Sequence, residues 1–171
     1  MRADQDPAGA ITVQARYADL IVIGQRDPEE SATGVPPSLV EKTVLSVGRP
    51  MLVVPYYTDA YPKLGSIVLV AWSGTRESVR AVRDALPLLQ SAENVVIMAV
   101  NPSVSRRGHG EIPGADLASY LARHGIKAEV RSSVATDIGV GDELLARTSD
   151  MGADLMVMGA YGHSRLQEMV M

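Results

Sequence analysis

Short apolar runs alternate with longer amphipathic stretches along the chain. Five of these runs are continuously apolar, which is typical of parallel strands that helices bury on both faces. They are "DLIVIG" (19–24), "MLVVPY" (51–56), "IVLVAW" (67–72), "VVIMAV" (95–100) and "DLMVMG" (154–159). A sixth run, residues 127–135, is more polar and predicts a strand nearer a sheet edge.

Amphipathic patterns between these runs predict helices over 38–48, 75–90, 114–125 and 139–152. The second places Val79, Val82, Leu86 and Leu89 on one stripe, and the fourth carries Leu144, Leu145 and Thr148. Ser38 and Glu41 have the spacing of a capping box, and glycines close the helices over 38–48, 114–125 and 139–152. Strands alternating with helices predict βαβ crossovers, and therefore an α/β, Rossmann-like doubly wound parallel sheet.

One strand occurs twice. Residues 18–24 (ADLIVIG) and 153–159 (ADLMVMG) are identical at five of seven positions, and their offset of 153 − 18 = 135 residues is about one domain length. The pattern favours duplicated domains, although two unrelated buried strands can also look alike because apolar strands use few residue types.

Composition narrows the class of protein. Hydrophobic residues make up 46% of the 171 and charged residues 21%, which predicts a packed core. With a net charge of −4, nothing in the overall charge favours nucleic acid or an anionic membrane as a partner. No Cys is present, so disulfides and thiolate ligands are excluded and a cytoplasmic location is expected.

Several segments resemble universal stress proteins. "IVLVAWSGTRESVRAVRDALPLL", "VVIMAVNP" and "ADLMVMGAYGHSRLQEMVM" are similar to one domain of that family, whereas "ARYADLIVIGQ" and "VLSVGRPMLVVPY" resemble the closing part of the first domain in a tandem member. The resemblance implies a five-stranded parallel sheet, with domains pairing through their last strands. On this interpretation residues 1–57 are the end of a first domain, 58–65 are a linker, and 66–171 are a second domain without its last helix and strand. We therefore expect a sequence truncated at both ends.

The resemblance also implies an adenine nucleotide site. Nucleotide-binding members carry Gly-x-x-Gly, nine residues, and then Gly-Ser or Gly-Thr; Gly159 and Gly162 supply the first half, and 163–171 are the nine residues that follow. Glycines let the backbone approach an anion closely, and consecutive amides can surround phosphate oxygens. A tight turn after a buried strand would require the same glycines.

Three further residues complete the expected site for ATP or a related nucleotide. Val100 matches the position whose backbone the family uses beside adenine, and His163 could contact a phosphate. Ser73 stands where nucleotide-binding members usually have Asp; a hydroxyl can donate or accept a hydrogen bond but lacks the charge of that carboxylate. Ser73 could instead form an ordinary turn and helix cap, and Val100 could be a core residue. In the first domain the Gly-x-x-Gly is not kept, and nearby acidic residues predict that this half binds no nucleotide.

No pattern indicates a catalytic centre or a metal site. His109, His124 and His163 lack ligand spacing, and neither a P-loop nor a nucleophile elbow occurs. At most, slow hydrolysis of ATP is expected. Two functions stay open: a nucleotide-binding stress or signalling module, and an interaction protein of the same fold that binds no nucleotide. In both cases we expect a homodimer, for which residues 38–56 are a candidate swapped element.

Overall fold

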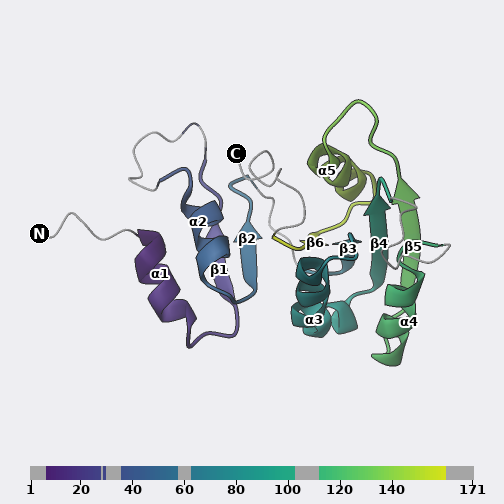
Figure 1. Cartoon of the computed structure of the whole chain (residues 1–171), viewed down its shortest axis with the longest axis horizontal. Coiled ribbons are helices and arrows are strands. Elements are labelled where there is room, and N and C mark those ends of the chain that lie inside the picture. Colours follow the sequence, from purple (N-terminus) through teal and green to yellow (C-terminus); the bar gives the residue numbers. More distant parts are fainter. Residues whose placement is uncertain (1–6, 28, 30–35, 58–62, 103–111, 161–171) are drawn as a thin grey trace, which may run out of the picture. The chain divides into compact units, whose positions relative to one another are not determined.

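Helices and parallel strands alternate along the chain, as the apolar pattern predicts (Figure 1). The computed structural model describes residues 7–27, 29, 36–57, 63–102 and 112–160. Contacts divide the chain into two units; their described residues are 7–57, which we call unit 1, and 63–160, which we call unit 2. Each unit has its own sheet.

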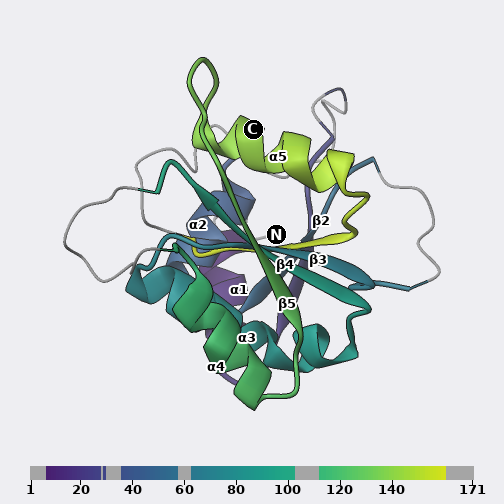
Figure 2. The same cartoon turned by 90° about the vertical axis from the view of Figure 1, so that its right-hand side faces the viewer.

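Unit 2 contains four strands and three helices among its described residues. They are β3 (Ile67–Ala71), α3 (Arg76–Ser91), β4 (Asn94–Val100), α4 (Ala115–Arg123), β5 (Ala128–Ser133), α5 (Val140–Asp150) and β6 (Leu155–Val157). All the strand pairs are parallel, in the order β5-β4-β3-β6. Figure 2 shows α5 on one face of this sheet and α3 and α4 on the other. The chain therefore winds in both directions from β3, which confirms the doubly wound parallel sheet.

The central strands explain the continuous apolar runs. Residues 68–70 of β3 are completely buried, and residues 95–99 of β4 are almost so. Both faces of these strands lie under helices, so neither face favours polar side chains. In β5 the exposure instead alternates from Ala128 to Arg131, and the strand lies at the sheet edge, as predicted.

The predicted stripe of α3 is partly wrong. Val79 is 51% exposed, and the buried positions are Ser78, Val82, Ala85 and Leu89. The helix is rotated so that Ser78 is buried, and the backbone of its first turn, at Glu77 and Ser78, lies against Gly159. In α5 only Leu144 of the two predicted leucines is buried.

Unit 1 has the predicted strand–helix–strand order after a first helix. Its elements are α1 (Pro7–Ala15), β1 (Ile21–Gly24), α2 (Leu39–Ser46) and β2 (Met51–Val54). The two strands are parallel and in register from Ile21↔Met51 to Gly24↔Val54. Ala15, Ile21 and Val47 form a small core, against which Ile11 and Met51 pack.

Helix ends follow the sequence signals only in part. Glycines in the left-handed conformation follow α2, α4 and α5 within two residues, as predicted; they are Gly48, Gly125 and Gly152. Ser38 is the N-cap of α2, but its side chain makes no capping hydrogen bond, so the predicted capping box is not formed.

No helix in the described ranges has the length and apolar character needed to cross a membrane. That the units are repeats joined by a linker at 58–65 stays a prediction.

Candidate functional site

The carboxyl ends of β4, β3 and β6 lie at one edge of the sheet of unit 2. Because these neighbouring strands are parallel, the segments that follow them begin at the same edge. Val100 is the last residue of β4, Ser73 lies two residues after β3, and Gly159 lies two residues after β6. The fold thus brings three of the five predicted site residues to one edge. The other two, Gly162 and His163, lie outside the described residues.

Ser73 belongs to the turn that starts α3. Its exposed hydroxyl oxygen lies 3.1 Å from the Thr75 hydroxyl oxygen, and Gly74 between them adopts φ +69°. Thr75 is the N-cap: its side chain accepts a hydrogen bond from the amide of Ser78, at 3.5 Å. The turn and cap considered as the alternative for Ser73 are therefore present. The Ser73 hydroxyl remains at the surface, where a ligand can reach it.

Gly159 lies directly against the first turn of α3. A Cβ atom at this position would be 2.7 Å from the Glu77 carbonyl carbon and 2.8 Å from the Ser78 amide nitrogen. Both are backbone atoms of a helix, so they cannot move aside cheaply. The glycine is thus required for packing between the end of β6 and α3, whether or not an anion binds there.

The charges beside Gly159 are mixed. Glu77 lies in the first turn of α3, where the helix dipole favours a carboxylate. The Arg76 guanidinium donates a hydrogen bond to it and lowers the pKa of the Glu77 carboxyl below its ordinary value. A phosphate near Gly159 would therefore meet an ionised carboxylate whose charge Arg76 offsets in part.

Val100 is half-buried at the end of β4 and pairs with Ser133 of β5. Asn101, the next residue, adopts φ 48°, which is unusual for a residue other than glycine. Its side chain accepts a hydrogen bond from the amide of Ala135 at 2.8 Å and donates one to the Ala135 carbonyl at 3.3 Å. Asn101 therefore fixes the turn after β4 to the turn after β5, and so positions the Val100 backbone.

Sequence reasoning did not identify Asn101. The signal was an Asn directly after a buried strand and before Pro102, where Asn tolerates the left-handed conformation better than most residues. A side-chain amide that bonds to both backbone groups of one distant residue cannot be derived from that local pattern.

The described histidine, His124, is the C-cap of α4, which agrees with its predicted place at a helix C-terminus. Its ring contacts the Tyr120 ring at a tilt of 58°, with 4.7 Å between the centroids. His109 lies outside the described residues. Across the described ranges, no three His, Asp or Glu side chains are grouped so that they could hold a metal ion.

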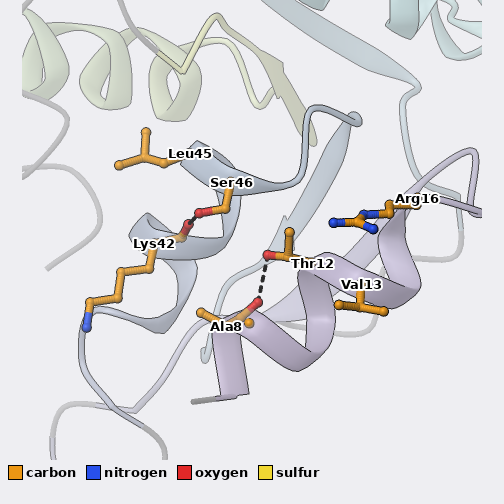
Figure 3. Close-up of a pocket in the computed structure, with 8 residues that line it drawn as sticks. Ala8, Thr12, Val13, Arg16, Lys42, Leu45 and Ser46 are labelled. Carbon is orange, nitrogen blue, oxygen red and sulfur yellow. Dashed lines mark hydrogen bonds between the residues drawn. The ribbon is translucent and has the colours of Figure 1, made fainter. Parts of the chain in front are cut away.

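Unit 1 has an open hollow between α1 and α2 (Figure 3). It has a volume of about 470 Å³ and is lined by Ala8, Gly9, Thr12, Val13, Arg16, Lys42, Leu45 and Ser46. The Thr12 and Ser46 hydroxyls donate to carbonyls of their own helices, at 2.7 Å each. The lining offers mostly apolar surface with two basic side chains, Arg16 and Lys42, and no pair of groups suited to acid–base chemistry.

Solved structures with the same fold are known, although no family model and no curated protein matches the sequence. A universal stress protein from Archaeoglobus fulgidus superposes with a TM-score of 0.68 over 90% of this chain, at 19% sequence identity. The chain has the universal stress protein fold. The resemblance predicted from the sequence is thereby confirmed at the level of the fold.

Two further superpositions cover less of this chain. A universal stress protein family member from Burkholderia pseudomallei gives a TM-score of 0.46 at 24% identity, over 61% of this chain and 87% of that one. Protein Rv1636 from Mycobacterium tuberculosis gives 0.44 at 24% identity, over 59% and 75%. The universal stress protein fold of this chain rests on the Archaeoglobus structure, of which it spans 55% of the length.

Proposed function

We propose that the chain is a universal stress protein-like module for stress response or signalling, which binds ATP or another adenine nucleotide at the carboxyl edge of unit 2. The observation that carries the proposal is the placement of Ser73, Val100 and Gly159 after three neighbouring strands. This edge includes the point at β3 from which the chain winds in both directions, where ligands of doubly wound sheets bind.

Each predicted residue has a distinct task in this proposal. Backbone amides at Gly159 and Gly162 donate to phosphate oxygens, and His163 contacts a phosphate. The backbone of Val100, fixed through Asn101, lies beside the adenine, and the Ser73 hydroxyl bonds to the ribose. No described side chain at this edge is placed as a general base, so we propose binding as the main event and turnover as slow at most.

The proposal is tested by calorimetric titration and thermal shift with ATP and AMP. Ser73→Asp is the informative variant, because a carboxylate accepts hydrogen bonds more strongly than a hydroxyl does. We expect it to tighten binding about tenfold, which corresponds to about 1.4 kcal/mol. Ser91→Asp, which places the same charge at the far end of α3, should leave affinity unchanged.

Gly162→Trp tests the phosphate end, and it should abolish binding. Gly159 is unsuitable for this purpose, since any side chain there would disturb α3. Absence of heat and of thermal shift at millimolar nucleotide would reject the proposal. Retention of binding in Gly162→Trp would reject the placement of the phosphates.

A second candidate function is an interaction protein that binds no nucleotide. It is favoured by apolar side chains exposed on the strands of unit 1, among them Val22 and Val53. We propose a homodimer for this function, with residues 38–56 as the exchanged element. A monomer in light scattering, with 38–56 readily cleaved by protease, would contradict it.

A cytoplasmic location remains a prediction from the cysteine-free composition.

A further inference from the structure

The turn after β4 has an unusual backbone. Within the described ranges, Asn101 is the one residue other than glycine that has a positive φ, at 48°. Pro102 follows it, and the ring of a proline restricts the conformation of the preceding residue further. A backbone conformation of this kind costs free energy and persists only where surrounding contacts impose it. The contacts of Asn101 therefore decide how β4 ends.

These contacts join the end of β4 to the end of β5. The Asn101 amide donates a hydrogen bond to the Ser133 carbonyl at 2.9 Å, which continues the ladder between the two strands. In a regular parallel ladder the Asn101 carbonyl would then accept the amide of Ala135. The side-chain oxygen of Asn101 accepts that amide instead, at 2.8 Å, and the side-chain nitrogen donates to the Ala135 carbonyl at 3.3 Å. The backbone thus leaves the ladder at this point while the side chain keeps it attached to β5.

Val100, the residue before this turn, has backbone polar groups without partners. Because backbone groups alternate between the two sides of a strand, those of Asn101 point to β5 and those of Val100 point to the β3 side. The ladder between β3 and β4 ends at the pair Ala71↔Met98. No described residue bonds to the amide or the carbonyl of Val100. One donor and one acceptor therefore lie next to each other at the carboxyl edge.

A donor next to an acceptor is complementary to one edge of adenine. The N1 atom of adenine accepts a hydrogen bond and its N6 amine donates one, so a backbone amide and carbonyl can pair with both. Hypoxanthine and guanine have a protonated N1 and a 6-oxo oxygen, which reverses donor and acceptor at this edge. The Ser73 hydroxyl cannot distinguish these bases in this way, because a hydroxyl donates as well as accepts. Selectivity for adenine then depends on how firmly the Val100 backbone is held.

We propose that Asn101 is a positioning residue that makes the candidate site selective for adenine over 6-oxopurines. Its two side-chain hydrogen bonds to Ala135 hold the turn, and the turn holds the amide and carbonyl of Val100 where they match N1 and N6 of adenine. A 6-oxopurine in the same position places an oxygen against the Val100 carbonyl and an N–H group against the amide, and both contacts are repulsive. This inference rests on the proposed nucleotide site and specifies which base that site selects.

The test compares ATP with inosine triphosphate, which has the same charge and nearly the same shape but carries a 6-oxopurine. Calorimetric titration of the whole chain should give ATP an affinity at least about a hundredfold higher. Asn101→Gly tolerates the positive φ but makes neither bond to Ala135, and we expect it to reduce this ratio to less than about tenfold. The loss should come from weaker binding of ATP.

Two further variants serve as controls. Asn101→Asp keeps an acceptor for the Ala135 amide, and its added charge opposes both triphosphates equally, so the ratio should stay within about threefold of that of the unaltered chain. Asn94→Gly makes the same change as the test variant at the exposed first residue of β4, away from the carboxyl edge, and it should leave the ratio unchanged.

A measurement on the unaltered chain does not depend on the folding of any variant. ATP should slow hydrogen exchange at the Val100 amide, because N1 of adenine accepts from it, and inosine triphosphate should not. Equal protection by both nucleotides overturns the proposal.

The affinities separate this inference from the proposed function. Equal affinity of the unaltered chain for the two nucleotides overturns the inference but leaves the nucleotide site. An equal loss of both affinities in Asn101→Gly also overturns it, since the side chain would then only stabilise the turn. Absence of any nucleotide binding rejects the proposed function, and this inference with it.

Discussion

Glycines at equivalent positions of the repeat are expected to respond differently to the same substitution. Gly159→Ala places a Cβ 2.7–2.9 Å from backbone and side-chain atoms at the start of α3, so α3 or the end of β6 must shift. We expect a loss of about 1–3 kcal/mol in the free energy of unfolding. Gly24→Ala meets no atom and should be neutral or slightly stabilising. Urea unfolding of both variants measures the difference, and equal effects would show that the close approach does not exist.

At the residue scale, the position of a residue such as Gly159 was predicted from the sequence more accurately than its structural role. Gly159 was placed correctly after a buried strand, but its interpretation as a residue that admits an anion missed the backbone of α3. The reason is that Glu77 and Ser78 are distant from Gly159 in sequence and come close to it only when β6 pairs with β3. Ser78 was missed as a core residue for the same reason.

Asp154 joins two elements, and its removal should weaken the sheet. Asp154→Ala leaves the amides of Ser66 and Ile67 without their acceptors at the start of β3. Loss of hydrogen bonds to a charged acceptor typically costs about 1–3 kcal/mol, and we expect a decrease of this size in the free energy of unfolding. Asp19→Ala removes the same side chain from the repeat and should change stability by less than about 0.5 kcal/mol.

Chemical denaturation of both aspartate variants supplies the measurement. A destabilisation by Asp19→Ala that equals that of Asp154→Ala would mean that Asp19 already holds a strand start within the chain.

At the element scale, the order of strands and helices and the parallel sheet were predictable from sequence. Continuous apolar runs at 67–72 and 95–100 are strands because both of their faces are covered, and the more polar 127–135 is an edge strand. The capping box predicted at Ser38 is wrong: the Ser38 side chain makes no capping bond, and the spacing of Ser38 and Glu41 does not reveal the backbone angles there, φ −86° and ψ 10°. Helix rotation, which decides between Val79 and Ser78, depends on the packing partner and not on the helix alone.

At the scale of the whole molecule, sequence motifs identified the edge of the sheet at which the candidate site lies, but not every residue that forms the site. Ser73, Val100 and Gly159 lie together because parallel strands share their carboxyl edge, which the alternation of elements implies. Asn101, which fixes the turn beside Val100, was not predictable, because its partner Ala135 follows a different strand. Gly162 and His163 stay predictions that the binding experiments address.

The two units should differ in local stability. The small core of unit 1 consists of Ala15, Ile21 and Val47 with two partly buried neighbours, whereas in unit 2 residues 68–70 and 95–99 of the central strands are buried between layers of helices. Since opening a small core exposes less apolar surface, amides of β1 and β2 should exchange with solvent at least a hundredfold faster than those of β3 and β4, a difference of about 2.7 kcal/mol. Hydrogen exchange followed by mass spectrometry, on peptides covering 20–25 and 67–71, measures both in one sample. Equal protection would mean that unit 1 is held by contacts beyond its own core.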